Sequence, residues 1–389
     1  MLNLTKIYCG TPTPGDHLRY APGISRARKP VVVWNLTRTC NLACVHCYTS
    51  SESRSYPREL STKEAKSVLR DLSDFGCPVV IFSGGEPLLR RDLLPLAEAA
   101  VDGGIKPVLS TNGTLITKTM AARIKASGIG YVGISLDGVG DINDVFRGVA
   151  GAFQRALQGI RNCLSEGLRT GIRFTITRYN SPQTGDIFRL AEREGVQRLC
   201  LYHLVYVGRG SDIEGDDLGR EEKRRLMDRI LEWTEGTWQA GRPMEILTVD
   251  NSADAAYVYM KLNEKDETRA EGGLRLLRWN GGNSSGYGIA CIDEQGEVHP
   301  DQFWRHCDLG DVRERPFSEI WEDESHPVLR ALRNRKPLLK GRCSRCVFID
   351  ICNGGLRVRA EAATGDLWAP DPACYLTERE VISGKLDET

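Results

Sequence analysis

The sequence predicts an α/β protein in which six strand-helix units curve into a partial barrel, followed by a small metal-binding lobe. Three observations support this. Between Lys29 and Val207, short β-branched runs alternate with amphipathic segments, which is typical of strands joined by helices. Three of the 13 cysteines follow the first predicted strand, and four more lie within residues 340–389, where periodicity is weak. Functional loops in such barrels lie at the carboxyl ends of the strands, so we expect the chemistry there.

The barrel elements are predicted from the period of the apolar residues. The predicted strands are Val31–Leu36, Val79–Ser83, Lys106–Ser110, Tyr131–Ser135, Ile172–Thr177 and Leu199–Val207. The predicted helices between them are Thr62–Asp74, Leu93–Asp102, Lys118–Ala126, Phe153–Glu166 and Thr184–Glu194. Ser61 and Glu64 have the spacing of a capping box, which supports the start of the first helix. Six right-handed units of this kind close most of a barrel.

The pattern changes after Gly208, where a turn-rich stretch precedes a charged amphipathic helix over Glu221–Thr234. A third region begins in Gly272–Gly288, and the segments Ile289–Asp293 and Glu297–His299 indicate a hairpin. We therefore divide the chain into an N-terminal segment over the active site (1–28), the barrel (29–210), a helical connector (211–279) and a C-terminal cluster lobe (280–389).

Composition excludes several classes of function. The 52 Lys and Arg residues balance the 52 Asp and Glu residues, so no overall field would hold the protein on nucleic acid or on an acidic membrane. The longest apolar runs, such as Val31–Trp34 and Pro78–Phe82, are too short to span a bilayer. The N-terminal residues lack the pattern of a secretory signal. We expect a cytoplasmic protein without nucleic-acid or membrane partners.

Cys40, Cys44 and Cys47 form a C-x3-C-x2-C motif directly after the first predicted strand. Three thiolates this close can hold three irons of a 4Fe-4S cluster and leave the fourth iron open to a ligand. The alternatives are a zinc site completed by His46 or a distant residue, or three buried thiols. A c-type haem attachment is disfavoured because Tyr48 follows Cys47.

With this triplet the sequence resembles the radical S-adenosylmethionine superfamily, over about residues 30–207. The resemblance implies a TIM-type partial barrel, (β/α)6, that binds S-adenosylmethionine at the open iron and releases a 5′-deoxyadenosyl radical. Four further motifs support it: Ser83-Gly-Gly-Glu-Pro87, Ser110-Thr-Asn-Gly113, Ser135-Leu-Asp-Gly138 and Phe146-Arg-Gly148. Taken singly, each is an ordinary cap or turn.

The same resemblance implies roles for individual residues. The two glycines would let the backbone approach the ligand closely, Glu86 would accept from the ligand's ammonium group, and Arg147 would pair with the methionyl carboxylate. The cofactor-binding candidates are Tyr48, Gly84, Gly85, Glu86, Ser110, Asn112, Ser135, Asp137 and Arg147.

Cys343, Cys346, Cys352 and Cys374 form a complete four-ligand set. Their spacing resembles the SPASM/twitch-like extension of radical enzymes, which implies one auxiliary 4Fe-4S cluster. The alternative is a zinc knuckle with the same four thiolates.

Two departures from the full SPASM pattern argue against a second auxiliary cluster. Leu356 and Asp301 stand where full members have cysteines, so the vacated position would leave room beside the barrel mouth. Cys291 and Cys307 are ambiguous: they could join Cys343 and Cys346 as ligands, but burial explains both, and we interpret them as structural thiols.

The stretch from His299 to Glu314, together with Phe317–Trp321, resembles the tetrapyrrole-modifying branch of the superfamily. The N-terminal stretches Lys6–Thr11 and Asp16–Tyr20 are more similar to the 12,18-didecarboxysirohaem deacetylases. This resemblance implies removal of two acetate side chains to give iron-coproporphyrin III, with the auxiliary cluster as electron acceptor or relay. The implied partners are a sirohaem-derived tetrapyrrole and an electron donor such as ferredoxin or flavodoxin.

The candidate substrate contacts are charged and metal-binding side chains. Arginine pairs with carboxylates bidentately, and histidine can approach the substrate iron. The candidates are Arg19, Arg209 and Arg305 for carboxylates, His17, His299 and His306 for the iron, and Asp301.

Three alternatives stay open. One is NirJ-type modification of propionate side chains in dioxo-isobacteriochlorin haem biosynthesis. The second is a radical peptide maturase, although only about 30 residues precede the first strand where its usual peptide-binding domain needs about 80. The third is a non-catalytic iron-sulfur protein or zinc-bound scaffold, which would not cleave S-adenosylmethionine.

Overall fold

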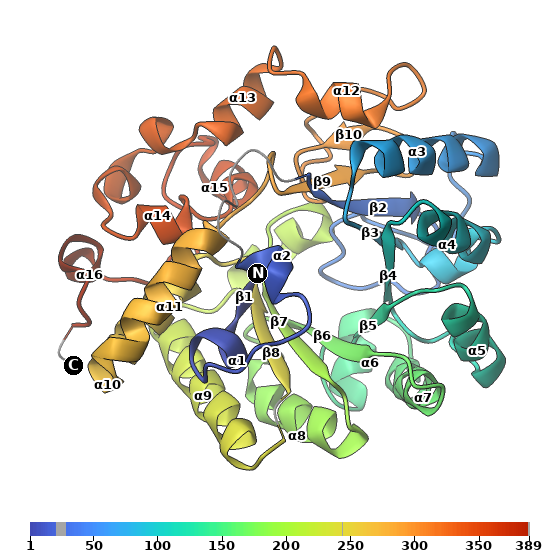
Figure 1. The fold of residues 1–389 in the computed structure, drawn as a ribbon. Coiled ribbons are helices and arrows are strands. Elements are labelled where there is room, and N and C mark those ends of the chain that lie inside the picture. Colours follow the sequence, from blue (N-terminus) through green and yellow to red (C-terminus); the bar gives the residue numbers. More distant parts are fainter. Residues whose placement is uncertain (21–28, 243, 388–389) are drawn as a thin grey trace.

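The fold is described from a computed structural model that covers residues 1–20, 29–242 and 244–387. It is built on one open ten-stranded sheet with the order β1-β8-β7-β6-β5-β4-β3-β2-β9-β10 (Figure 1). Strands β2 to β8 run parallel and make the partial barrel. The strands are β1 Leu2–Asn3, β2 Val31–Thr37, β3 Val79–Gly84, β4 Lys106–Thr111, β5 Tyr131–Ser135, β6 Thr170–Ile176, β7 Arg198–His203, β8 Glu245–Val249, β9 Ile289–Ile292 and β10 Val298–His299.

Helices surround the barrel sheet on its outer face, as Figure 1 shows. These are α3 Thr62–Phe75, α4 Leu93–Asp102, α5 Lys118–Ala126, α6 Asp141–Arg147, α7 Ala152–Ser165, α8 Thr184–Glu194 and α9 Arg220–Gln239. The capping box predicted for α3 is present: the Ser61 amide donates to Glu64 Oε2 (2.7 Å), and the Glu64 amide donates to Ser61 Oγ (3.3 Å).

The remaining helices belong to the N-terminal segment and to the chain after β8. They are α1 Leu4–Ile7, α2 Asp16–Arg19, α10 Ala253–Lys265, α11 Glu267–Asn280, α12 Phe317–Glu322, α13 Pro327–Arg333, α14 Ile349–Cys352, α15 Arg357–Thr364 and α16 Glu378–Ser383. Short 3-10 turns are η1 Pro87–Leu89, η2 Ser181–Gln183, η3 Gly208–Asp216, η4 Lys336–Leu338 and η5 Gly341–Arg345. None of the helices in the described ranges is long and apolar enough to cross a bilayer.

The C-terminal lobe joins the barrel through its sheet. Strand β9 pairs in parallel with β2, with Cys291 beside Val33, and β10 pairs antiparallel with β9. The predicted hairpin is therefore present, and it extends the barrel sheet at its β2 edge. At the other edge, β1 pairs antiparallel with β8.

All six predicted strands form, but two barrel elements were not anticipated. Helix α6 occupies a stretch read as a motif loop, and strand β8 lies inside the segment predicted to be a helical connector. Strand β8 is fully buried although it begins with Glu245. The carboxylate of that residue is neutralised by Arg169 and Arg198 (2.6 Å each), a pairing that local sequence does not reveal. The four-part division of the chain stays a prediction, and residues 21–28 of its N-terminal segment lie outside the described residues.

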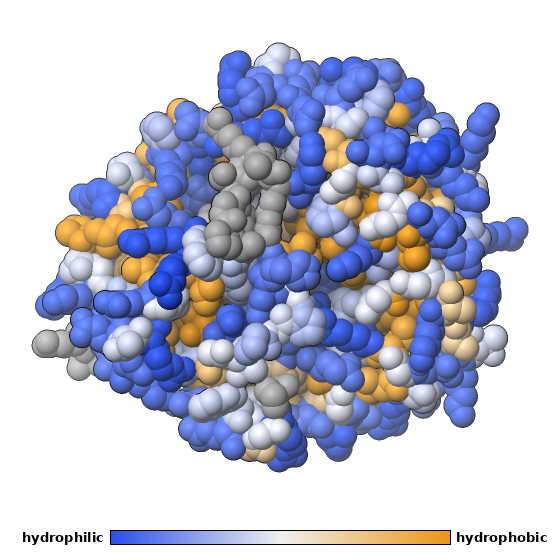
Figure 2. Space-filling view, in the orientation of Figure 1, coloured by the Kyte–Doolittle hydropathy of each residue, from blue (hydrophilic) through white to orange (hydrophobic). Residues whose placement is uncertain are grey.

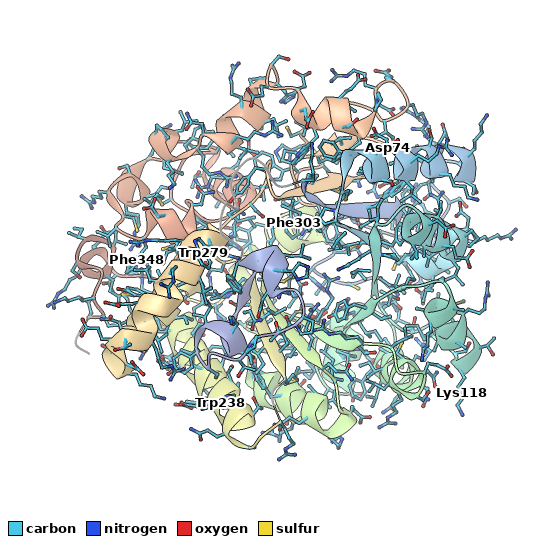
Figure 3. All side chains as sticks on the ribbon, in the orientation of Figure 1. Asp74, Lys118, Trp238, Trp279, Phe303 and Phe348 are labelled. Atoms are coloured by element: carbon cyan, nitrogen blue, oxygen red, sulfur yellow. The ribbon has the colours of Figure 1, made fainter. Side chains whose placement is uncertain are left out.

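The core lies between the sheet and the helices around it. Trp34, Phe82 and Phe174 are among the largest fully buried side chains, and they come from β2, β3 and β6. The face shown in Figure 2 is mainly hydrophilic, with hydrophobic residues in small groups. Among the side chains drawn in Figure 3, Phe303 lies near the centre of the molecule, where the lobe meets the barrel.

Candidate active site

The first cysteine group lies on the loop that leaves the carboxyl end of β2. Cys40 and Cys44 are buried and Cys47 is half-buried. The Cys40 amide donates to the Glu52 carbonyl (2.9 Å). Arg209 clamps the loop: its amide donates to the Cys47 carbonyl (3.0 Å) and its Nε to the Cys44 carbonyl (2.8 Å). The loop backbone is thus fixed by contacts within the protein.

Each thiol of this group also receives a hydrogen bond. Cys40 Sγ accepts from the amide two residues further along (3.4 Å), Cys47 Sγ from the Ser51 amide (3.4 Å), and Cys44 Sγ from Arg147 Nη1 (3.5 Å). Burial raises the pKa of Cys47, but hydrogen bonds from neighbouring hydroxyl and amide groups and the charge of Arg209 lower it more, below its ordinary value. At Cys40 and Cys44 burial outweighs the hydrogen bonds and raises the pKa. Binding of iron would replace these protons, because the thiolate is the form that binds iron.

A buried ion pair stands behind this loop. Arg147 Nη2 contacts Asp137 Oδ2, and His46 Nε2 lies 3.6 Å from the same oxygen. The other Asp137 oxygen accepts from the Thr175 amide (2.6 Å). Burial lowers the pKa of His46 to about 4, so its imidazole is neutral at pH 7. Arg147 therefore reaches Cys44 with its charge already balanced by Asp137.

The glycine pair after β3 is required by the cysteine loop itself. A Cβ on Gly84, whose φ is 130°, would lie 2.3 Å from the Thr37 carbonyl oxygen. A Cβ on Gly85 would lie 2.3 Å from the Thr39 carbonyl oxygen. Sequence analysis ascribed both glycines to the approach of a ligand. Both line the cavity described below, but glycine is required at these positions because two backbone segments pass close to each other.

Gly85→Ala is expected to destabilise the protein, because the new methyl group would overlap the Thr39 carbonyl. Overpacking of this kind costs about 1–3 kcal/mol, measurable by urea or thermal unfolding. A matched control is Gly236→Ala at an exposed position of α9, where an added Cβ meets no described atom outside its own helix within 4 Å. This control should stabilise by about 0.5–1 kcal/mol. Similar effects of the two substitutions would contradict the steric explanation.

Glu86 lies beneath the glycine pair and is completely buried. Its carboxylate accepts from Thr111 Oγ1 (2.7 Å) and from the Asn112 amide (2.8 Å). Burial raises its pKa. Glu86 and Asp137 do not line the cavity, so in this structure both support its wall, and a contact of either with the cofactor stays a prediction.

A cavity of about 330 Å³ opens where the barrel strands end and the lobe begins. Its volume lies at the lower end of the range of about 300–1,000 Å³ that is typical of small-molecule sites. Tyr48 and Phe303 pack edge-on across it, with ring centroids 5.5 Å apart. The predicted site residues that line it are Cys40, Cys44, Cys47, Tyr48, Gly84, Gly85, Ser110, Asn112, Ser135, Arg147 and Asp301.

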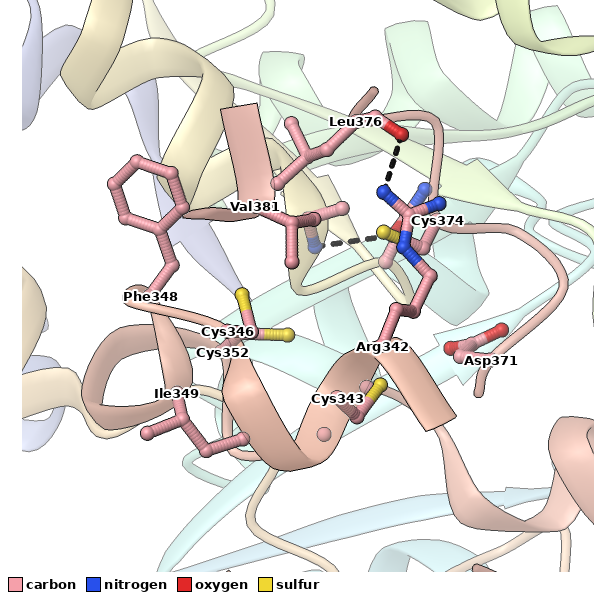
Figure 4. Close-up of a pocket in the computed structure, with 14 residues that line it drawn as sticks. Arg342, Cys343, Cys346, Phe348, Ile349, Cys352, Asp371, Cys374, Leu376 and Val381 are labelled. Atoms are coloured by element: carbon pink, nitrogen blue, oxygen red, sulfur yellow. Dashed lines mark hydrogen bonds between the residues drawn. The ribbon is translucent and has the colours of Figure 1, made fainter. Parts of the chain in front are cut away.

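The second cysteine group surrounds a separate pocket in the lobe (Figure 4). Its thiols belong to Cys343, Cys346, Cys352 and Cys374. Burial raises the pKa of all four, and a bound cation would replace their protons. Cys291 and Cys307 are not part of this lining.

The loop around residues 282–285 connects the two pockets. A Cβ on Gly282 would lie 2.3 Å from the Cys352 carbonyl oxygen, and the Asn283 amide donates to that oxygen (3.3 Å). Both loop residues also line the main cavity, as does Leu356. Leu356 and Asp301, the residues predicted to replace cluster cysteines, thus stand in the wall of the main cavity.

A compact set of potential metal ligands lies outside both cysteine groups. Among the described residues, which include all 13 cysteines, three ligand atoms within 4.8 Å of one another occur at Asp293, Glu297 and His299 and include no thiol.

The arginines predicted to bind substrate carboxylates contact other groups of the protein. Arg19 pairs with Glu245 (2.9 Å), and Arg305 binds Glu294 through two nitrogens (2.8 Å each). Arg209 holds the cysteine loop. None of the three lines the cavity, so the structure does not support the predicted contacts.

The predicted histidines also lie outside the cavity lining. His17 is on α2. His299 is buried, with Nδ1 2.8 Å from the Cys307 carbonyl oxygen, and exposed His306 pairs with Glu361 (2.9 Å). Of the seven predicted substrate residues, Asp301 alone lines the cavity.

Sequence analysis missed four charged or titratable residues of the lining: Arg173, Tyr202, His203 and Asp250. His203 Nε2 lies 3.0 Å from buried Asp254. A signal existed for Arg173, because it interrupts an apolar strand between Ile172 and Phe174. A charge in the middle of such a strand indicates a polar barrel interior.

The sequence matches two families. It matches the radical SAM superfamily over residues 34–191 and SPASM, an iron-sulfur cluster-binding domain, over residues 284–347. The first match contains the C-x3-C-x2-C loop, and the second contains Cys343 and Cys346.

Relatives and solved structures agree with these matches. The chain is 51% identical to Fe-coproporphyrin III synthase of Methanosarcina barkeri, over 98% of this chain and 99% of that protein. It is 46% identical to pre-heme d1 synthase of Dinoroseobacter shibae, over 95% and 90% of the two chains. Its fold is similar to Streptococcus suis SuiB bound to S-adenosylmethionine, with a TM-score of 0.70 and 21% identity over 89% of this chain and 77% of that chain.

Proposed function

We propose, because this chain belongs to the radical SAM superfamily, that it removes the two acetate side chains of 12,18-didecarboxysirohaem to give Fe-coproporphyrin III. It is a radical SAM enzyme of haem biosynthesis. The specific reaction rests on one observation, the 51% identity with Fe-coproporphyrin III synthase over nearly the whole of both chains. The similarity to pre-heme d1 synthase favours NirJ-type chemistry as the second candidate.

The radical SAM and SPASM regions imply two 4Fe-4S clusters. We assign the first to Cys40, Cys44 and Cys47 and the auxiliary one to Cys343, Cys346, Cys352 and Cys374. When bound, the first cluster would supply the electron that cleaves S-adenosylmethionine to methionine and a 5′-deoxyadenosyl radical. Around it the chain supplies hydrogen bonds to the sulfurs and a cavity wall that limits access of water.

Each acetate group would leave in three steps. A hydrogen atom passes from the reduced ring to the 5′-deoxyadenosyl radical, the carbon–carbon bond to the side chain breaks, and the ring gains a double bond. The departing carbon takes up one electron and one proton and leaves as acetate. The reaction therefore needs one electron to cleave S-adenosylmethionine and one to reduce the departing carbon. A ferredoxin or flavodoxin would supply both.

We propose that the auxiliary site relays electrons to the cavity, and two contacts between the pockets support this. Asn283 lines the cavity and its amide donates to the Cys352 carbonyl (3.3 Å). Asn251 lines both pockets. None of the 13 cysteines, all of which the structure describes, forms a disulfide. This fits a reducing compartment, and we propose that the enzyme works in the cytoplasm.

An anaerobic assay tests the proposed reaction. The reconstituted enzyme is reduced with dithionite and given S-adenosylmethionine, with and without didecarboxysirohaem, and products are followed by mass spectrometry. We expect 5′-deoxyadenosine and a tetrapyrrole lighter by two acetate groups. Formation of 5′-deoxyadenosine with an unchanged tetrapyrrole would contradict the substrate assignment, and NirJ-type substrates would be tested next.

A further inference from the structure

One arginine of the cavity has no carboxylate partner. Arg173 lies on β6, and its side chain contacts one residue of the neighbouring strand β7 and one of β4, which lies beyond β5 in the sheet. Its Nε donates to Tyr202 Oη (2.9 Å), and its Nη1 donates to Ser110 Oγ. Its main electrostatic neighbours are Tyr202, Cys200 and Tyr131, and no carboxylate within the described ranges lies within ion-pairing distance of it.

The contrast with the adjacent arginine is informative. Arg198, on β7, stacks on the Tyr131 ring (4.3 Å to its centroid) and pairs with Glu245 (2.6 Å). Its charge is therefore neutralised inside the protein. Arg173 has only neutral hydrogen-bond partners, and a desolvated charge of this kind is costly unless an anion compensates it.

A glycine beside Arg173 leaves space for its side chain. On the neighbouring strand β5, a Cβ on Gly133 would lie 3.0 Å from Arg173 Cδ. The glycine thus allows the arginine stem to cross the barrel interior. Ser110 and Tyr202 fix two of its nitrogens, so the planar guanidinium is held in one orientation at the cavity wall.

We propose that Arg173 is the receptor for a carboxylate of the substrate tetrapyrrole, an inference that rests on the proposed function. A carboxylate inside this cavity could come from the tetrapyrrole or from the methionine part of S-adenosylmethionine. The geometry favours the tetrapyrrole, because the methionine part is expected beside Cys44, and Arg147, not Arg173, is the arginine that contacts that thiol (3.5 Å). Arg173 is held instead by the side chains of Ser110 on β4 and Tyr202 on β7.

The test is binding of Fe-coproporphyrin III to the cluster-loaded enzyme, followed by its Soret absorbance. Arg173→Met should weaken binding roughly 10- to 100-fold, because a hydrogen-bonded charge pair is lost. Arg173→Lys keeps the charge without the planar fork and should weaken it less. Arg189→Met, at an exposed position of α8, is the matched control and should bind like wild type. The methyl ester of Fe-coproporphyrin III, which lacks carboxylates, should bind wild type and Arg173→Met equally.

The outcomes separate this inference from the proposed function. Unchanged binding by Arg173→Met, with tight binding by wild type, overturns the role of Arg173 alone. A raised KM for S-adenosylmethionine in 5′-deoxyadenosine formation, with unchanged porphyrin binding, assigns Arg173 to the methionine carboxylate and also overturns it. Failure of the wild type to bind Fe-coproporphyrin III overturns the proposed function as well. If Arg173→Met does not fold, Arg173→Lys and Tyr202→Phe provide the test instead. Tyr202→Phe is expected to weaken binding of Fe-coproporphyrin III roughly 2- to 10-fold.

Discussion

Cys44→Ala is expected to abolish cleavage of S-adenosylmethionine. Cys44 is buried in the cavity wall, and its thiol accepts from Arg147 Nη1 (3.5 Å). Without it, two thiols remain at the barrel mouth, and a 4Fe-4S cluster held by two cysteines is not stably bound. We expect 5′-deoxyadenosine to fall to background and iron content to fall by about four per chain, with the auxiliary cluster retained.

Cys163→Ala provides the matched control. Cys163 is fully buried in α7 and lies in neither pocket. It should keep the iron content and the activity of the wild type. Full 5′-deoxyadenosine formation by Cys44→Ala would contradict the assignment of the first cluster.

Cys352→Ala is expected to abolish formation of Fe-coproporphyrin III while cleavage of S-adenosylmethionine persists. Its thiol lines the auxiliary pocket, while its carbonyl accepts from Asn283 in the cavity wall. We expect loss of the auxiliary cluster and of Fe-coproporphyrin III formation, because the proposed electron relay is broken. Cleavage of S-adenosylmethionine without tetrapyrrole should persist, since the Cys40, Cys44 and Cys47 loop is intact. Iron analysis, electron paramagnetic resonance and product mass spectrometry measure the three properties.

Cys307→Ala serves as its control, because Cys307 lies in the same lobe but outside the auxiliary pocket. It should retain both clusters and form product. Loss of iron from Cys307→Ala would show that this residue is a ligand and would contradict our four-cysteine assignment. Normal product formation by Cys352→Ala would contradict the relay.

Local sequence predicted the features that depend on local rules. The six predicted strands and helices α4, α5 and α8 follow from the apolar period, and the start of α3 follows from its capping box. The cysteine loop and the motifs after β3, β4 and β5 follow from the rule that sites gather at the carboxyl ends of parallel strands. The three cysteines and most of these motif residues line one cavity, whereas Glu86 and Asp137 do not.

What local sequence could not predict depends on partners distant in the chain. Arg19 was a reasonable carboxylate receptor until the fold placed it beside Glu245, the first residue of β8, whose carboxylate also pairs with Arg169 and Arg198. Arg305 is likewise held by Glu294. Arg173 was overlooked because its significance is the lack of such a partner among the described residues, which becomes visible only in three dimensions.

The most direct test of the account is the ratio of 5′-deoxyadenosine to Fe-coproporphyrin III in a single anaerobic reaction with limiting didecarboxysirohaem. If each acetate group leaves after one hydrogen-atom transfer, two molecules of 5′-deoxyadenosine accompany each Fe-coproporphyrin III, once the background without tetrapyrrole is subtracted. Fe-coproporphyrin III formed without 5′-deoxyadenosine, or 5′-deoxyadenosine formed beside an intact tetrapyrrole, would contradict it.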